Sequence, residues 1–122
     1  LPIYPPVLEK LKKYPFQELL DVGCGTGPMI ELLLKEFLDK SYTGIDLTPR
    51  MIEVAQEKKL DHSRFLVGDS ENLPFEKDTF DAVICTNSFH HYSNPQAFIN
   101  EASRVLKDGG SLRSRKVSVC TW

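Results

Sequence analysis

The stretch LLDVGCGTGPMIELL, residues 19–33, decides the fold, because three glycines stand within five positions between two apolar segments. Glycine weakens any regular element, so its concentration at one point predicts a sharp turn. The segment before it is a strand candidate, and the apolar residues after it recur at helical spacing. We predict a strand–turn–helix unit whose turn lets a ligand approach the backbone. A tight turn that binds nothing is the alternative.

The rest of the chain repeats this alternation. A helical segment is expected at residues 1–15, before a domain at 16–122. The apolar patterns predict strands over 18–22, 42–46, 64–67 and 80–85, a fifth strand within 111–122, and helices over 30–37, 48–59 and 94–106, the last two with N-caps Thr48 and Asn94. Alternating strands and helices favour a parallel sheet with right-handed crossovers. The predicted class is α/β, with a Rossmann-like, doubly wound, mostly parallel sheet.

Composition narrows the classes of function. The chain has 122 residues, is 41% hydrophobic and carries a net charge of −2, so we expect one domain and no nucleic-acid partner. Apolar runs stay shorter than the roughly 18 residues of a membrane span. The three cysteines show no CxxC spacing, which favours reduced thiols in a cytoplasmic protein over a disulfide framework or a metal site.

Polar residues and glycines follow each of the first four predicted strands. In parallel sheets, ligands bind outside the carboxyl ends of the strands, so these residues are the candidates for a site. They are Asp21 with the glycine turn, Asp46 with Leu47, Asp69 with Ser70, and Asn87. Each alone is weak support for a site, because turns are built from such residues. Four groups at one edge of the sheet are stronger support.

The spacing of the glycines indicates the kind of ligand. Dinucleotide-binding loops follow GxGxxG, whereas Gly23, Gly25 and Gly27 form GxGxG and Pro28 lacks the next N–H donor. A pyrophosphate would use that donor, and it would be repelled by the nearby carboxylate of Asp21. S-adenosylmethionine carries a sulfonium and an ammonium group and no phosphate. The turn therefore favours S-adenosylmethionine over NAD.

Two further acids fit an adenosine-containing ligand. Asp46 lies 46 − 23 = 23 residues after the first glycine, near the position where an acid accepts hydrogen bonds from ribose hydroxyls. Its structural alternative is an Asx-type cap, a role that Thr48 already fills in the prediction. Asp69 is a candidate acceptor for the adenine amino group, and its alternative is an ordinary turn aspartate.

Three segments carry a family resemblance: LLDVGCGTG, YTGIDLTPRMIEVAQEK, and the stretch from FLVGDSENLPF to RVLKDGG. Over residues 16–112 the chain resembles class I S-adenosylmethionine-dependent methyltransferases, in the small-molecule branch that includes the quinone-biosynthesis enzymes. The resemblance implies these cofactor-binding residues: Asp21, Gly23, Cys24, Gly25 and Gly27 around the methionine part, Asp46 at the ribose, Leu47, Asp69 and Ser70 at the adenine, and Asn87 towards the substrate.

The chain departs from the family pattern at its end. The family has a seven-stranded sheet, whereas this chain reads DGGSLRSRKVSVCTW and places Arg113, Arg115 and Lys116 where burial is expected. We therefore expect the last strands of the family fold to be missing. The alternating charges of this segment suit an exposed edge strand. Separately, the missing strands would leave an exposed apolar edge, which predicts self-association.

The resemblance implies methyl transfer from S-adenosyl-L-methionine to a small-molecule acceptor by in-line displacement, with S-adenosyl-L-homocysteine as the product. The catalytic residues are unknown. His90 and His91 are weak candidates for a general base, and side chains that pack or face solvent are the alternative. No metal site is predicted. Two alternative functions remain, a catalytically inactive S-adenosylmethionine-binding module and an NAD-binding oxidoreductase.

Overall fold

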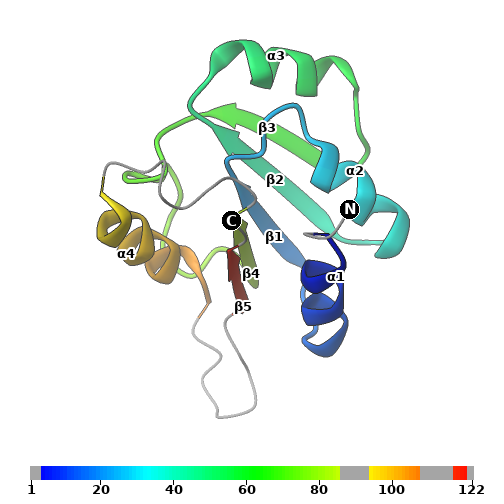
Figure 1. Cartoon of the computed structure of the whole chain (residues 1–122), viewed down its shortest axis with the longest axis horizontal. Coiled ribbons are helices and arrows are strands. Elements are labelled where there is room, and N and C mark those ends of the chain that lie inside the picture. The colour runs from blue at the N-terminus through cyan, green and yellow to red at the C-terminus, as the bar shows by residue number, and fades with distance from the viewer. Residues whose placement is uncertain (1–3, 86–93, 108–116, 121–122) are drawn as a thin grey trace.

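The computed structural model describes residues 4–85, 94–107 and 117–120. Helices and strands alternate along these residues, except that β3 and β4 follow one another without a helix between them (Figure 1). Their order is α1 (Tyr4–Lys13), β1 (Glu18–Val22), α2 (Pro28–Glu36), β2 (Ser41–Asp46), α3 (Pro49–Glu57), β3 (Ser63–Val67), β4 (Ala82–Cys85), α4 (Pro95–Val105) and β5 (Val117–Cys120). The predicted order of elements and the α/β class are confirmed. The residues Arg113, Arg115 and Lys116 lie outside the described residues.

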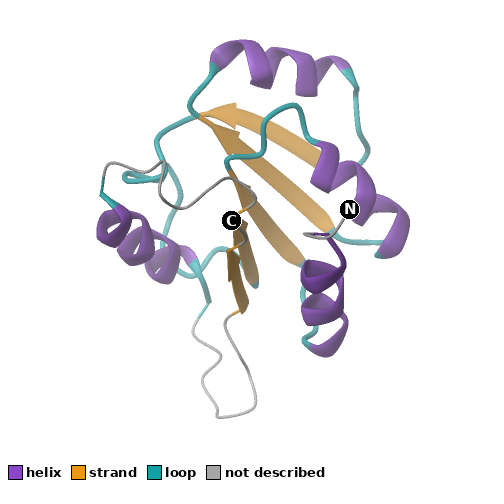
Figure 2. Ribbon diagram, viewed as in Figure 1, coloured by secondary structure: helices purple, strands orange, loops and turns teal. Residues whose placement is uncertain are grey.

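The strands form one sheet in the order β3-β2-β1-β4-β5, and every described pairing is parallel (Figure 2). The strand order reverses beside β1, between its neighbours β2 and β4. A crevice for ligands is expected at such a reversal, at the carboxyl ends of the strands. The glycine turn follows β1, so the fold places it at this reversal.

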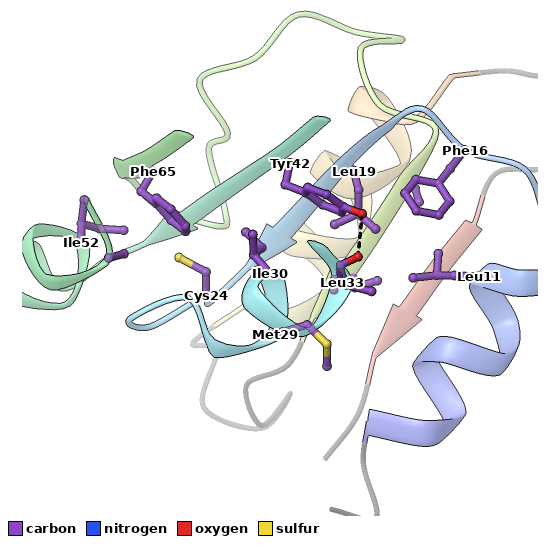
Figure 3. Close-up of a cluster of buried hydrophobic side chains, with 13 residues drawn as sticks. Leu11, Phe16, Leu19, Cys24, Met29, Ile30, Leu33, Tyr42, Ile52 and Phe65 are labelled. Carbon is purple, nitrogen blue, oxygen red and sulfur yellow. Dashed lines mark hydrogen bonds between the residues drawn. The ribbon is translucent and has the colours of Figure 1, made fainter. Parts of the chain in front are cut away.

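Helices cover the two faces of the sheet separately, as a doubly wound fold requires (Figure 1). α1, α2 and α3 cover one face, where Leu11, Leu33 and Ile52 join strand residues such as Tyr42 and Phe65 in one buried cluster (Figure 3). α4 covers the other face. The second cluster contains Leu20, Val22, Ile45, Leu73, Phe80, Val83, Cys85, Phe98, Ala102, Val105 and Leu106. None of the described helices is long and apolar enough to cross a membrane.

The start of α3 differs in detail from its prediction. Pro49 follows Thr48 as expected, but the Thr48 side chain makes no capping hydrogen bond. Instead, the Thr48 N–H donates to Asp46 Oδ1 at 2.9 Å, so the aspartate supplies the Asx-type contact. α3 also ends at Glu57, two residues early, because Lys59 has a positive φ of 49° that no α-helix accommodates. The cap of α4 is as predicted, with Asn94 Oδ1 accepting from the Ala97 N–H at 3.2 Å.

Asp81 joins the starts of β1 and β4 at the end of the sheet opposite the glycine turn. Its Oδ2 atom accepts the N–H groups of Gln17 and Glu18, both at 2.8 Å. Lys107 Nζ lies 3.4 Å from Oδ1. Burial on its own would raise the pKa of Asp81, but the two backbone N–H donors and Lys107 together lower it. The folded state therefore favours the ionised carboxylate.

We expect Asp81→Ala to lower the free energy of unfolding by about 1–3 kcal/mol at pH 7, because hydrogen bonds to a charged group are lost. Since folding lowers the pKa of Asp81, its contribution is complete above the unfolded value of about 3.9. It is lost as the pH falls through the lower folded value. The difference between variant and parent should thus shrink in acid. Urea denaturation from pH 2 to 7 measures it, with the exposed Asp61→Ala as a control. A difference independent of pH would contradict the assignment.

Candidate functional site

The three glycines of the turn after β1 all adopt positive φ angles, of 76° at Gly23, 58° at Gly25 and 90° at Gly27. Side chains at such angles are strained, which explains why the sequence concentrates glycine here. A Cβ at Gly25 would meet no other atom within 4 Å, whereas a Cβ at Gly27 would lie 3.1 Å from Phe65 Cζ. At Gly27, close packing against Phe65 therefore adds to the conformational preference for glycine. Gly25 borders open space, as a point of approach to the backbone would.

Most N–H groups of the turn already donate within the chain. Gly23 and Cys24 both donate to the carbonyl of Ile45, at 2.8 and 3.1 Å. Gly25 donates to Asp46 Oδ2 at 2.9 Å, and Gly27 donates to the Cys24 carbonyl at 3.0 Å. Pro28 has no N–H to offer. Loops that bind phosphate direct several backbone N–H groups at the ligand. In this turn, four N–H groups instead donate to acceptors in β2 or within the turn itself.

Asp46 connects the ends of β1 and β2. It is 9% exposed, and its two oxygens accept one N–H each, from Thr48 at Oδ1 and from Gly25 at Oδ2. A carboxylate has about four lone-pair positions, so these bonds leave about two for other donors. The predicted Asx-type alternative is thus present, but it uses only part of the carboxylate. Hydroxyl groups of a ribose are suitable donors for the remainder.

Asp21 and Cys24, just before and within the glycine turn, are both buried. Asp21 is fully buried within β1 and Cys24 is 3% exposed. Cys24 Sγ packs into the cluster between β2 and α2, where a Cβ at Gly44 would lie only 2.8 Å from it (Figure 3). Burial raises the pKa of the Cys24 thiol, and the carboxylates of Asp21 and Asp46 raise it further. Two acids beside a neutral thiol give this end of the sheet a negative electrostatic environment.

The thiol of Cys24 should consequently resist alkylation in the folded protein. We expect iodoacetamide at pH 8 to modify Cys24 more than about tenfold more slowly in buffer than in 8 M urea, because the thiolate is the reactive form. Mass spectrometry of the peptide that contains Cys24 gives both rates. Equal rates would show that the thiol is accessible and ionised, contrary to the packing described above.

Exposed apolar side chains lie beside Asp46. Leu47, Met51 and Val67 are 69%, 43% and 50% exposed. Asp46 and Val67 are paired in register, and Leu47 directly follows Asp46. Three exposed apolar residues therefore stand at the ends of β2 and β3 and at the start of α3. A flat apolar ring is the kind of ligand group that such a surface covers.

Asp69 and Ser70 follow β3, next to this apolar surface in the chain. Asp69 is exposed, and its Oδ1 atom accepts the Glu71 N–H at 2.9 Å. The turn alternative for Asp69 is therefore present too, again with lone pairs left over. Ser70 is half-buried. The fold thus brings the ends of β1, β2 and β3, with Asp21, Asp46 and Asp69, to one edge of the sheet.

The remaining predicted residues, Asn87, His90 and His91, lie outside the described residues. Within the described part of the chain, no group of three or more His, Cys, Asp or Glu side chains is suited to hold a metal ion. Sequence reasoning missed a network that holds the loop after β3, formed by Glu71, Glu101 and Arg104. The i, i+3 spacing of Glu101 and Arg104 on a predicted helix was the available signal.

A glycine turn at the strand-order reversal, with a carboxylate at the end of the next strand, is typical of α/β proteins that bind their ligands at the carboxyl edge of the sheet. The comparisons with known proteins agree. The family model described as "Methyltransferase domain" matches residues 20–113, and the chain belongs to this family.

Two curated relatives and one solved structure illustrate the match. The chain is 39% identical to a phthiotriol/phenolphthiotriol dimycocerosates methyltransferase of Mycobacterium leprae, over 79% of this chain and 36% of the relative. It is 36% identical to a demethylmenaquinone methyltransferase of Thermotoga maritima, over 87% and 46%. A SAM-dependent methyltransferase from Aquifex aeolicus superimposes with a TM-score of 0.74 at 28% identity, over 85% and 58%. The chain therefore spans about a third to just over half of these proteins, and the resemblance to methyltransferases, including a quinone-biosynthesis type, is confirmed.

Proposed function

We propose that this chain binds S-adenosylmethionine at the carboxyl edge of β1, β2 and β3 and serves methyl transfer to a small-molecule acceptor. The observation that carries the proposal is the state of the glycine turn. Its N–H groups at Gly23, Cys24, Gly25 and Gly27 are already bonded within the chain, and buried Asp21 and Asp46 stand beside it. Such a turn suits a ligand with positive charge and without phosphate.

The described residues fit the parts of this ligand. Asp46 keeps lone pairs for the two ribose hydroxyls, and Leu47 offers an apolar face to the adenine ring. Asp69 is an exposed acceptor for the amino group of adenine. Asp21 and the turn are proposed to hold the methionine part, whose ammonium group a nearby carboxylate attracts.

S-adenosylmethionine supplies a methyl group that its sulfonium has already activated for in-line displacement. The protein's task is alignment, because a reacting pair held about 3–3.5 Å apart in line needs no protein nucleophile. Positive charge disperses as the methyl is transferred, so a carboxylate against the sulfur would stabilise the ground state more than the transition state. Asp21, Asp46 and Asp69 are therefore assigned to the ammonium, ribose and adenine. The catalytic residues stay unassigned, with His90 and His91 as candidate bases for a hydroxyl acceptor.

Calorimetric titration tests the cofactor assignment directly. We expect S-adenosylhomocysteine to bind with a Kd below about 100 μM, and NADH to bind at least about tenfold more weakly, since a pyrophosphate finds few N–H donors and an adverse charge at the turn. Tighter binding of NADH would refute the proposal and favour the oxidoreductase alternative. Adenosine serves as a control, because it shares the ribose and adenine contacts with both ligands.

A second candidate is an S-adenosylmethionine-binding module without catalysis. The chain spans 36% to 58% of the length of the relatives above, so cofactor binding and methyl transfer are tested separately. Formation of S-adenosylhomocysteine from S-adenosylmethionine, in the presence of demethylmenaquinone or a phthiotriol-type lipid as acceptor, distinguishes the two. Binding without formation of this product, with either acceptor, supports the module.

Self-association through an edge of the sheet remains a proposal. Among the described strands, β3 and β5 are the edges of the sheet, and each has one strand as its neighbour. An edge strand offers free N–H and C=O groups to a second chain. Light scattering after gel filtration is expected to show a dimer or larger species at concentrations near 100 μM, by the mass action that governs such contacts. A monomer throughout would count against it.

A further inference from the structure

The loop between β3 and β4 is held by side chains of α4. The N–H of Leu73 donates to Glu101 Oε1 at 2.8 Å, and the carbonyl of Leu73 accepts from Arg104 Nη2 at 2.9 Å. Both polar backbone groups of one loop residue thus bond to one pair of side chains. Arg104 Nη1 also donates to the carbonyl of Phe75 at 2.7 Å. Two residues of the loop, Leu73 and Phe75, are thus held by side chains from one turn of α4.

Glu101 and Arg104 also bind each other in a geometry that defines both side chains. Arg104 Nε donates to Glu101 Oε2 and Nη2 donates to Oε1, both at 2.9 Å. Two parallel bonds of this kind set orientation as well as distance. The Glu101 side chain is 19% exposed, so the pair is shielded more than an ordinary surface pair. The hydrogen bond from Arg104 lowers the pKa of Glu101 most, burial opposes this, and the Leu73 N–H lowers it further.

A second link joins the same loop to the start of α4. Glu71 Oε2 accepts the N–H of Asn94 at 3.0 Å, and Asn94 is the N-cap of α4. Glu71 is two residues after Asp69, and its own N–H donates to Asp69 Oδ1. The short turn that contains Asp69 is therefore linked to α4 at two places. Glu71 bonds to the N-cap of α4, and Leu73 bonds to Glu101 in its second half.

We propose that Glu101 and Arg104 are positioning residues for nucleobase recognition: they fix the loop so that Asp69 faces the amino group of the adenine. This inference rests on the proposed function. Asp69 is exposed, so little packing holds it, and the anchored backbone four residues further on does so instead. Pre-organising a loop in its binding conformation removes the cost of ordering it when the ligand arrives.

A change in base selectivity separates this role from a merely structural one. S-inosylhomocysteine replaces the amino group of adenine with an oxygen, so a carboxylate at that point loses a hydrogen bond. We expect the parent protein to bind S-adenosylhomocysteine at least about tenfold more tightly than the inosyl analogue, which is the effect of one hydrogen bond to a charged group. In Glu101→Gln the ratio of the two Kd values should fall to about twofold, because the loop is no longer held by a charged fork.

Two further variants complete the experiment. Arg104→Lys keeps the charge but lacks the planar fork, and it should lower the ratio as well. Arg104→Lys also replaces Glu101→Gln as the test variant if circular dichroism shows that Glu101→Gln does not fold. Asn100→Ala lies next to Glu101 on α4 and touches Gln96 rather than the loop, so it should leave the ratio unchanged. Titrations are made well below the midpoint of thermal unfolding of each variant.

The outcomes are distinct. A ratio that falls in Glu101→Gln and Arg104→Lys but not in Asn100→Ala supports the inference. Variants that lose thermal stability, or that bind both ligands equally more weakly, while keeping the parent ratio would overturn it and leave the pair a structural one. If the parent protein binds S-adenosylhomocysteine without preferring it to the analogue, Asp69 is not the base-reading residue and the inference fails. If the parent binds neither ligand, the proposed function itself fails first.

Discussion

Asp46→Ala is expected to weaken S-adenosylhomocysteine binding by at least about 100-fold, because two hydrogen bonds from ribose hydroxyls to a charged acceptor are lost together. The same change removes the acceptor for the N–H groups of Gly25 and Thr48. The free energy of unfolding should therefore also fall, by about 1–3 kcal/mol. Calorimetry measures the first effect and urea denaturation the second.

Asp46→Asn refines this result. The amide keeps the size of the side chain and one accepting oxygen, but its NH2 group would face one of the two N–H donors. We expect stability between that of the parent and Asp46→Ala, with binding still weakened at least about tenfold. Glu57→Gln, an exposed acid at the end of α3, serves as the charge control. Near-parent affinity in Asp46→Ala would remove Asp46 from the ribose site, and unchanged stability would remove it from the support of the turn.

The glycines of the turn should separate stability from binding. Gly27→Ala is expected to lower the free energy of unfolding by about 1–3 kcal/mol, since a left-handed conformation is costly for alanine and its Cβ would crowd the ring of Phe65. Gly25→Ala, at a φ of 58° in open space, should cost about 1–2 kcal/mol from conformation alone. Its added methyl group points where the ligand is proposed to approach, so binding should fall at least about tenfold by steric exclusion.

Urea denaturation and titration with S-adenosylhomocysteine on the same two variants test this separation. The expected result is that Gly27→Ala loses more stability, while Gly25→Ala loses more affinity relative to its stability. Gly25→Asn is a useful companion, because asparagine tolerates the left-handed region and isolates the effect of added bulk. If Gly25→Ala and Gly25→Asn bound the ligand as the parent does, no ligand would approach the backbone at Gly25.

The order of helices and strands was predictable because buried positions recur as apolar residues at helical or strand spacing. β4 is a continuous apolar run, and β1 and β2 are buried along almost their whole length although both contain polar residues. Helix ends were less predictable. The position of the α4 cap at Asn94 followed from local chemistry. The early end of α3 at Glu57 was not predictable, because nothing in the sequence around Lys59 indicates its positive φ. Thr48 occupied its predicted N-cap position without its predicted side-chain bond, and its own N–H donates to Asp46.

The site could be predicted only in part, because some of its contacts join residues far apart in the chain. Asp21, Asp46 and Asp69 were predictable as strand-end acids, and the parallel sheet brings those ends to one edge. The bond from Gly25 to Asp46 spans 21 residues, and the bond from Leu73 to Glu101 spans 28. No sequence motif indicates either of these long-range hydrogen bonds. The role of Cys24 depends on packing against β2, which no pattern around position 24 reveals.

The distance along the chain between the loop after β3 and its anchors has a consequence for synthesis. Leu73 and Phe75 leave the ribosome about 30 residues before Arg104, the side chain that binds both of their carbonyl groups. Translation proceeds at about 5–20 residues per second, so the nascent loop waits seconds for its partner. A polypeptide that ends before residue 101 would therefore carry the glycine turn and β1 to β3 but leave the Leu73 N–H and the carbonyl groups of Leu73 and Phe75 without these partners.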